Sequence, residues 1–242
     1  MKEEGSNVNI NEISLIVPTR NEENIVEKNL KLIYEYLFAN KTFDDFEILV
    51  CDYSEDKTPG TVVSLSKKYP QIKYVPVKKK GVGIGIKIGM QSAKYDALMV
   101  YPIDMSWDIE CIQNSLLALS DNNVILGSRG HRDSIVNRPL KRRMFSKLYN
   151  LLVNLFFKLH IKDTQCTIAL RKSDLDCFID KLGSDGPFFQ TELLIHAKRQ
   201  NLNIVEIPAV VNDTREDSSI NPISDGFSMF KEIIRAYIKS NK

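Results

Sequence analysis

The chain has 242 residues, of which 43% are hydrophobic and 26% charged, the composition of a soluble globular protein with a sizeable core. A formal net charge of +2 is too small to indicate a nucleic-acid partner, and we expect none. The polar, acidic residues 1–12 do not resemble a secretory signal, and no apolar run approaches the roughly 20 residues that span a bilayer. These features predict a cytoplasmic protein. Four scattered cysteines predict reduced thiols and no structural zinc site.

Short apolar runs alternate with helical patterns through the first two thirds of the chain. The predicted strands are 13–18, 46–51, 72–77, 97–101 and 124–128, and the helices that follow them are 22–39, 57–69, 82–94, 108–119 and 140–159. This alternation predicts an α/β fold with a mostly parallel central sheet and helices on both faces. The strands are apolar throughout, as in a sheet that is covered on both sides.

After Lys162 the pattern changes. We expect a polar segment over 162–172, two helices, a strand over 203–211 and a last helix near 225–239. No internal repeat or long linker interrupts the sequence. The organisation is therefore predicted to be a polar tail, residues 1–12, and a single domain over 13–242.

The unusual residues lie at the carboxyl ends of the predicted strands, where ligands bind in sheets of this kind. In "VPTRNEEN" we expect Pro18 to stop the first strand and Asn21 to cap the helix after it. The second strand ends at Asp52, which either contacts a ligand or caps a helix. The fourth strand leads to Asp104, which either holds a metal or caps the next helix.

The third strand leads to "KKKGVGIGIKIG", a lysine cluster followed by glycines. The spacing fits neither the phosphate loop nor the dinucleotide-binding glycine pattern. Two interpretations stay open: a backbone that approaches a ligand closely beside cations, or a close contact between helix and sheet.

Residues 127–147 contain seven Lys or Arg and a single acid, Asp133. They run into an almost wholly apolar helix with one polar stripe, formed by Lys147, Asn150, Asn154 and Lys158. Such a helix is either core on most sides or lies in a membrane interface with its cations at the headgroups. Both interpretations remain open.

The order of these features resembles the family-2 glycosyltransferases of the GT-A fold, nearest to the polyprenyl-phosphate sugar synthases, including dolichyl-phosphate mannose and glucose synthases. The resemblance runs from Ile13 to about Lys239. It includes "GSR" at 127–129, "DTQC" at 163–166 and "FFQTELL" followed by "VEIP". It implies a GT-A nucleotide-diphospho-sugar transferase fold, with a nucleotide-sugar half over 13–128 and an acceptor half with amphipathic helices over 129–242.

The resemblance also implies a nucleotide site and a metal site. The residues implied to bind the nucleotide are Pro18, Arg20, Glu22, Asp52, Lys80, Gly81 and Ile103. A carboxylate suits the base because it only accepts hydrogen bonds. Asp104 and Ser106 would hold Mg2+ or Mn2+, weakly, because Pro102 stands where the family has its first acid.

On the acceptor side the resemblance implies roles that depend on charge. The residues implied to be catalytic are Asp104, Arg129, Asp163 and Arg215, and those implied to bind the acceptor are Arg142, Arg143, Gln165 and Glu192. Two departures from the family pattern stand out. Thr167 and Ile168 replace a Gly-Phe pair, and Ser219 occupies the position of a lysine that Arg215 could replace.

The resemblance predicts an inverting glycosyltransferase that moves a hexose from GDP-mannose or UDP-glucose to a polyprenyl or dolichyl phosphate. Such an enzyme would work peripherally at the cytoplasmic face of a membrane. Two alternatives remain: transfer to a non-lipid glycan acceptor, and a catalytically weak module that binds a nucleotide-sugar.

Overall fold

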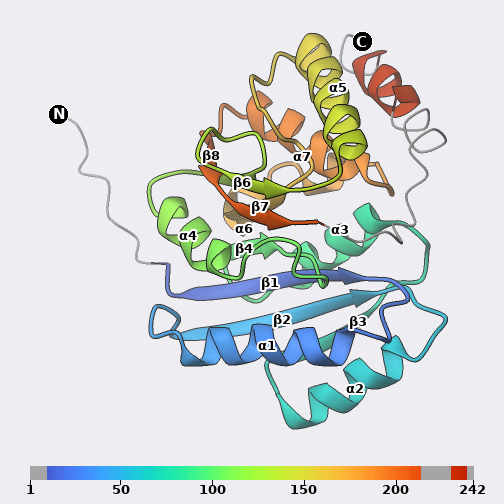
Figure 1. Ribbon diagram of the computed structural model, residues 1–242, viewed down its shortest axis with the longest axis vertical. Coiled ribbons are helices and arrows are strands. Elements are labelled where there is room, and N and C mark those ends of the chain that lie inside the picture. Colours follow the sequence, from blue (N-terminus) through green and yellow to red (C-terminus); the bar gives the residue numbers. More distant parts are fainter. Residues whose placement is uncertain (1–9, 214–229, 239–242) are drawn as a thin grey trace.

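The computed structural model describes residues 10–213 and 230–238, and a seven-stranded sheet runs through its centre (Figure 1). The strand order is β3-β2-β1-β4-β7-β5-β8. The strands are β1 (Glu12–Thr19), β2 (Asp45–Asp52), β3 (Ile72–Pro76), β4 (Ala97–Val100), β5 (Val124–Ser128), β7 (Thr167–Arg171) and β8 (Ile204–Pro208). Only β7 runs against its neighbours β4 and β5. Beside the sheet, β6 (Ile135–Asn137) pairs in parallel with β9 (Val210–Asn212).

Helices connect the strands as the alternating pattern predicts. They are α1 (Val26–Ala39), α2 (Thr58–Lys68), α3 (Val82–Ser92), α4 (Glu110–Leu119), α5 (Leu140–Phe157), α6 (Lys172–Leu175), the 3-10 turn η1 (Ile179–Lys181), α7 (Phe188–Arg199) and a helix over 230–238. Right-handed crossovers place α1 and α2 on one face of the sheet and α3 on the other, because the chain reverses direction across the sheet after β3. The α/β fold with a mostly parallel sheet is confirmed.

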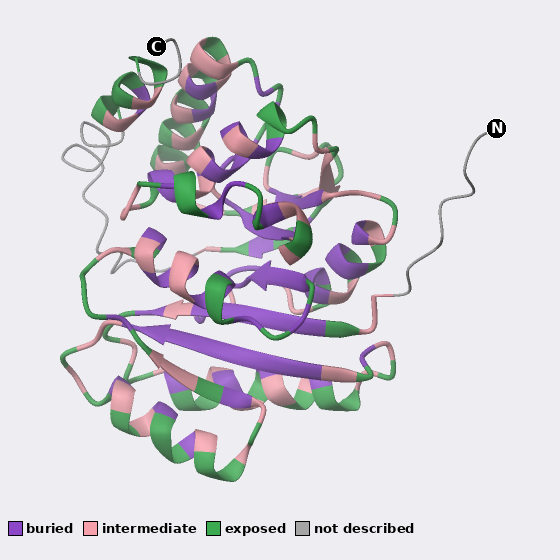
Figure 2. Ribbon diagram, turned by 180° about the vertical axis from the view of Figure 1, so that it is seen from behind, coloured by how far each residue is buried: buried purple, intermediate pink, exposed green. Residues whose placement is uncertain are grey.

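The core forms where these helices cover the strands. The residues of β2 from Phe46 to Asp52 are all buried, as are all four residues of β4. Figure 2 shows the inner strands of the central sheet buried along most of their length, whereas the edge strands β3 and β8 are only partly buried. Burying such apolar runs on both faces drives folding at about 25 cal/mol per Å² removed from water. It also holds the strand ends, where the polar residues lie, on a rigid frame.

Pro18 does not stop β1, contrary to the prediction from the sequence. The strand continues to Thr19, with Pro18 opposite Cys51 of β2. Pairing with β4, by contrast, ends at Ile16 and Val100. Successive residues of a strand direct their backbone groups to opposite neighbours, so the N–H that proline lacks would have pointed past the end of β4. The proline is tolerated there without loss of a ladder bond.

Two other predictions were wrong in detail. The segment 162–172 is not simply polar, because its last part forms β7 and fills the centre of the sheet between β4 and β5. The strand predicted over 203–211 is two strands, β8 and β9, separated at Ala209. The break lets the chain leave the large sheet and pair with β6, where Ile135 N–H donates to the Ala209 carbonyl at 3.0 Å.

The polar stripe predicted on α5 does not face solvent as a whole. Asn150 is buried and Asn154 is half-buried, while Lys147 and Lys158 are exposed. The outward face is apolar instead, and Leu140, Leu151 and Leu155 are 64–70% exposed. The helix over 230–238 lies beside α5, with the rings of Phe156 and Tyr237 5.1 Å apart in an edge-on arrangement. Across residues 10–213 and 230–238, no helix has both the length and the apolar character to cross a membrane.

Candidate active site

Asp52 lies at the carboxyl end of β2 and is 2% exposed. Its Oδ1 accepts from Thr19 Oγ1 at 2.9 Å and from Ser54 Oγ at 2.5 Å. Its Oδ2 has no hydrogen-bond partner within the described part of the chain. The hydroxyl of Tyr74 lies nearby, and its pKa is raised first by burial and second by the Asp52 carboxylate. A buried acceptor left without a donor costs about 1–3 kcal/mol, so the position suits a ligand N–H.

The loop after β1 is hydrogen-bonded to the loop after β2 and to the first residue of α2. Asn21 does not cap α1, which begins five residues later, at Val26, with no side-chain cap. Instead its N–H donates to Ser54 Oγ at 2.7 Å, and its Oδ1 accepts from the Glu55 N–H at 3.0 Å. Asn21 has a φ of 54°, a left-handed conformation that asparagine tolerates well. The N–H of Glu22 donates to Thr58 Oγ1 at 2.9 Å, which fixes the loop beside Asp52.

The glycines at the start of α3 lie in close contact with the loop before α7. A Cβ on Gly81, whose φ is 149°, would lie 2.2 Å from the Asp185 carbonyl oxygen. The same carbonyl accepts from the N–H groups of Gly83 and Ile84 at 2.9 and 3.3 Å. These contacts favour the interpretation that the glycines allow close packing. The start of α3 packs against the loop before α7 as well as against the sheet. Lys80 is exposed beside them.

Asp104 lies in a turn that begins after β4. The turn is held at one end by Asn29 of α1, whose Nδ2 donates to the Ile103 carbonyl at 2.9 Å. Asp104 Oδ1 accepts from both the N–H and the Oγ of Ser106, at 3.0 and 2.7 Å. The carboxylate and the hydroxyl predicted to bind metal therefore lie together. Nowhere in the described residues, this turn included, do three or more His, Cys, Asp or Glu side chains gather as a metal centre.

Strand β9 is hydrogen-bonded to this turn. The Asn212 N–H donates to the Ser106 carbonyl at 2.8 Å, and the Asp108 N–H donates to the Val210 carbonyl at 2.9 Å. Asp108 Oδ1 accepts from the Val210 N–H at 3.1 Å. Burial, followed by the Glu110 carboxylate, raises the pKa of Asp108. The turn after β4 and the end of β9 thus form one continuous piece of backbone structure.

Arg129 and Asp163 form a buried, bidentate ion pair. Arg129 Nε and Nη2 donate to Asp163 Oδ2 and Oδ1 at 2.7 and 2.8 Å, and Nη2 also donates to the Gln165 carbonyl. The side chains are 12% and 2% exposed. Burial alone would lower the pKa of Arg129, but the Asp163 carboxylate raises it. Burial would raise the pKa of Asp163, but Arg129 lowers it, so both groups are charged. The guanidinium also lies 5.2 Å from the Trp107 ring centroid.

A second cluster includes residues that the sequence did not single out. Asp213 accepts from Arg138 Nε at 2.7 Å and from Arg142 Nη1 at 2.8 Å. The geometry distinguishes Arg142, which points into this cluster, from Arg143, which is exposed. Arg138 belongs to the basic segment 127–147 that the sequence shows. Only the fold shows that it pairs with an acid 75 residues further along the chain. Arg215 falls outside the described residues.

Gln165 and Glu192, the other residues implied to bind the acceptor, make hydrogen bonds within the fold, as does Asn150 of the predicted polar stripe. Gln165 Nε2 donates to Thr191 Oγ1 at 3.0 Å. The buried Asn150 of α5 accepts through Oδ1 from the N–H and the Oγ1 of Thr164, at 3.1 and 2.9 Å. Glu192 Oε2 accepts from the N–H groups of Gly183 and Ser184 at 3.0 and 2.8 Å, so it caps the loop before α7.

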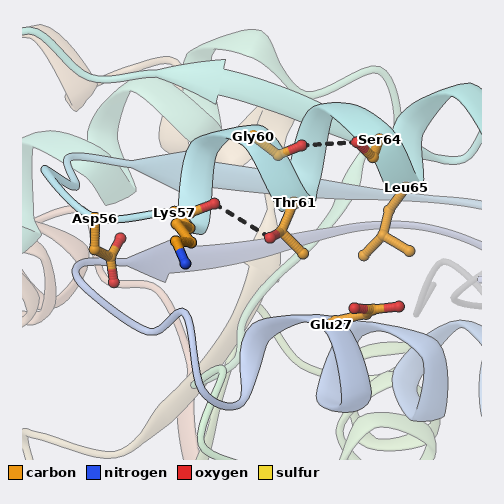
Figure 3. A pocket seen from close by; sticks show the side chains of 7 residues that line it. All are labelled: Glu27, Asp56, Lys57, Gly60, Thr61, Ser64 and Leu65. Atoms are coloured by element: carbon orange, nitrogen blue, oxygen red, sulfur yellow. Dashed lines mark hydrogen bonds between the residues drawn. The ribbon is translucent and has the colours of Figure 1, made fainter.

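A hollow of about 510 Å³ lies away from these groups, between α1 and α2 (Figure 3). It is lined by Glu27, Asp56, Lys57, Gly60, Thr61, Ser64 and Leu65. None of the predicted site residues lines it. Glu27 is already paired with Lys31 on α1, at 2.6 Å. The strand ends therefore define the site better than this hollow does.

The mostly parallel central sheet with helices on both faces is a GT-A fold, and solved structures agree. Glucosyl-3-phosphoglycerate synthase from Mycobacterium tuberculosis, solved with Mn2+, UDP and glucosyl-3-phosphoglycerate, matches with a TM-score of 0.68. The match covers 95% of this chain and 79% of that chain, at 17% identity, and it establishes the fold alone. The same synthase has been solved with Mg2+ and UDP.

The sequence comparison is more specific. The glycosyl transferase family 2 model matches residues 14–178, and the chain belongs to this family. Glycosyltransferase AglD of Haloferax volcanii is 26% identical over 231 residues, covering 93% of this chain and 37% of the relative. Dolichyl-phosphate beta-glucosyltransferase of Drosophila melanogaster is 25% identical over 245 residues, covering 94% of this chain and 75% of the relative. The resemblance found in the sequence is confirmed. The chain spans little more than a third of the AglD relative.

Proposed function

We propose that the protein transfers a hexose from a nucleotide-sugar to a polyprenyl or dolichyl phosphate, with inversion at the sugar. The observation that carries the proposal is the arrangement around β9. This strand is hydrogen-bonded to the Asp104 turn and leads directly into Asp213, which holds Arg138 and Arg142. A diphosphate donor held at the Asp104 turn and an anionic acceptor held by this cluster would therefore lie next to each other. Relatives named as dolichyl-phosphate glucosyltransferases support the same acceptor.

In this reaction an oxygen of the acceptor phosphate attacks the anomeric carbon of the sugar, and the bond from that carbon to the nucleoside diphosphate breaks. A phosphate acceptor is already anionic, so no general base has to remove a proton. Catalysis then depends on holding the two substrates in line and on stabilising the charge of the departing diphosphate. Asp52 would orient the nucleotide base through its unpartnered Oδ2. The arginines would orient the acceptor.

Asp104 and Ser106 fit a divalent cation because both supply oxygen and lie together in one turn. Mg2+ commonly uses only one or two protein carboxylates and takes its other ligands from phosphates and water. A cation held there would act as a Lewis acid on the leaving diphosphate. With a proline at position 102, the site would hold it weakly.

A release assay tests the function. UDP-glucose and GDP-mannose would each be incubated with the protein and Mg2+ or Mn2+, with and without a short polyprenyl phosphate, and nucleotide release measured. We expect release from one donor that requires the lipid phosphate. Release that is equally fast with a non-lipid glycan would favour the alternative acceptor, and binding of the nucleotide-sugar with no release would favour a binding module.

The outward face of α5 supports work at a membrane surface. Its apolar ridge consists of Leu140, Met144, Leu148, Leu151 and Leu155, each 54–70% exposed. The spacing of three and four residues puts all five on one side of the helix. Lys141, Arg143 and Lys147 are exposed along the same helix, which contains no acid. An apolar ridge with cations beside it is the pattern of a helix that lies in the interface of an anionic bilayer.

Vesicle co-sedimentation tests the ridge. The protein should bind vesicles with anionic lipid and should release them as salt rises, because each basic group near the surface contributes about 1 kcal/mol that salt screens. Replacing Leu148 and Leu151 with Ser should weaken this binding. Leu117→Ser on α4 is a matched control, because Leu117 is 56% exposed but lies outside the ridge. Equal losses in the two variants would contradict the assignment of the ridge.

A further inference from the structure

We infer that Asp213 is a positioning residue, which holds Arg138 and Arg142 together as a binding site for the phosphate of the acceptor. The inference rests on the proposed function and goes one step beyond it. It assigns to Asp213 the task of fixing the two arginines in place, and it names the phosphate as the group that they bind.

The hydrogen-bonded cluster of Asp213, Arg138 and Arg142 is called the clamp below. The two oxygens of Asp213 accept from different arginines, Oδ2 from Arg138 Nε and Oδ1 from Arg142 Nη1, at 2.7 and 2.8 Å. The three side chains are 14–20% exposed, so the clamp is largely shielded but remains reachable from solvent. Arg138 is fixed further, because its Nη1 donates to Ser146 Oγ at 2.7 Å. Two long side chains are thereby held in one arrangement before any ligand arrives, which lowers the entropic cost of binding.

The charges of the neighbourhood leave room for an anion. Arg129, Arg138 and Arg142 face two carboxylates, Asp163 and Asp213. After burial, the positive charge of Arg129 is the main factor that lowers the pKa of Arg138, so these two cations are near enough to repel each other. A phosphate placed beside them would relieve this repulsion, and guanidinium groups match phosphate oxygens in geometry.

The position of the clamp in the chain links it to the donor side. Asp213 directly follows β9, and its own N–H donates to the Asn137 carbonyl at 3.0 Å, so the residue is anchored from both sides. β9 in turn is hydrogen-bonded to the backbone of Ser106 and Asp108, in the turn that contains Asp104. Strand β9 therefore sets the distance between the acceptor cations and the diphosphate site, which a displacement reaction requires to be constant.

The test is a binding experiment with citronellyl phosphate, a water-soluble prenyl phosphate, measured by calorimetry without a sugar donor. Asp213→Asn keeps the shape but removes the charge, and it turns an N–H toward one of the arginines. We expect it to weaken binding roughly tenfold, the loss of one charged hydrogen-bonded contact. The affinity for UDP should not change. Asp133→Asn is the control, because Asp133 pairs with Arg132 on the exposed surface of the same region.

A double-mutant cycle separates positioning from a general effect on the fold. In an Arg138→Gln background, Asp213→Asn should weaken binding less than it does alone, because one of its two arginine partners is already gone. In transfer assays the KM for the prenyl phosphate should rise while kcat changes less. Unchanged affinity in Asp213→Asn, equal losses in both backgrounds, or no binding of the phosphate by the unaltered protein would each overturn the inference. Normal phosphate binding without sugar transfer would instead refute the proposed function and leave the clamp intact.

Discussion

The two sides of the site are built from different interactions. On the donor side, the loops after β1 and β2 are joined by hydrogen bonds between side chains and backbone N–H groups, such as Glu22 to Thr58 and Asn21 to Ser54. A single buried carboxylate, Asp52, keeps one oxygen without a donor. On the acceptor side the same work is done by ion pairs, Arg129 with Asp163 and Arg138 with Asp213.

Under the proposed function, this difference would determine how each side selects its ligand. Hydrogen bonds at fixed positions distinguish one ring pattern from another, which suits a nucleotide base. Paired charges with a positive excess respond to charge more than to shape, which suits a phosphate on a lipid of variable length. The stability of the acceptor side should therefore depend on charge and pH far more than that of the donor side.

The largest effect is expected from Asp163→Asn, which leaves Arg129 buried without its counterion. Removing one partner of a buried ion pair costs about 3–5 kcal/mol of unfolding free energy. Urea unfolding would measure it, with the exposed Asp133→Asn as a control that should cost less than about 0.5 kcal/mol. A loss below about 1 kcal/mol for Asp163→Asn would show that the pair is not what holds this side together.

The same pair predicts a pH dependence. The pKa of Asp163 is lower in the folded protein than in the unfolded chain, because Arg129 outweighs the effect of burial. Its stabilisation is therefore fully present above the unfolded carboxyl pKa of about 4 and is lost as the pH falls through the lower folded value. The gap in stability between the unaltered protein and Asp163→Asn should shrink in this acid range. A gap that stays constant down to pH 2 would contradict the assignment.

Next in size is Asp104→Asn, which should reduce turnover by roughly 10²–10³-fold, because it removes the one carboxylate that would hold the cation against the diphosphate. Binding of Mn2+, followed by electron paramagnetic resonance, should weaken in parallel, while the unfolding midpoint stays close to that of the parent. Full activity of the parent in excess chelator would remove the metal from the account and leave the arginines to neutralise the leaving group.

On the donor side, Asp52→Ala should weaken nucleotide binding by about 1–3 kcal/mol, the usual cost of removing a charged hydrogen-bond partner. Calorimetry with UDP and GDP would measure it and would also show which base the site prefers. The affinity for prenyl phosphate should be unaffected, since Asp52 belongs to the donor side. Unchanged affinity for both nucleotides would exclude Asp52 from the base pocket.

The smallest effect is expected from Pro102→Asp, which restores the acid that the family has at this position. A second carboxylate adds an oxygen ligand and a negative charge, so Mg2+ should saturate UDP binding at a several-fold lower concentration. Circular dichroism must first show that the turn after β4 is intact, because Pro102 accepts from the Met105 N–H there at 3.1 Å. A folded variant with unchanged metal dependence would mean that position 102 does not face the cation.

Much of the fold could be predicted because its strands are continuously apolar and its helices periodic. Strand β7 was missed because only four residues, Thr167 to Leu170, separate a polar segment from the basic pair that ends it. The sequence singled out Asp52 and Asp104 because they stand at, or a few residues after, the end of an apolar strand. The partner of Arg129 lies 34 residues away, and the choice between Arg142 and Arg143 depends on the phase of the first turn of α5. Neither can be read from spacing, because both depend on how distant elements meet.

Identification of the product tests the central claim most directly. The protein would be incubated with UDP-glucose or GDP-mannose, Mg2+ and a short polyprenyl phosphate, and the lipid fraction analysed by mass spectrometry and proton NMR. We expect a lipid phosphate that has gained one hexose, with the anomeric configuration opposite to that of the donor. Free sugar with unmodified lipid phosphate, or a product with retained configuration, would contradict it.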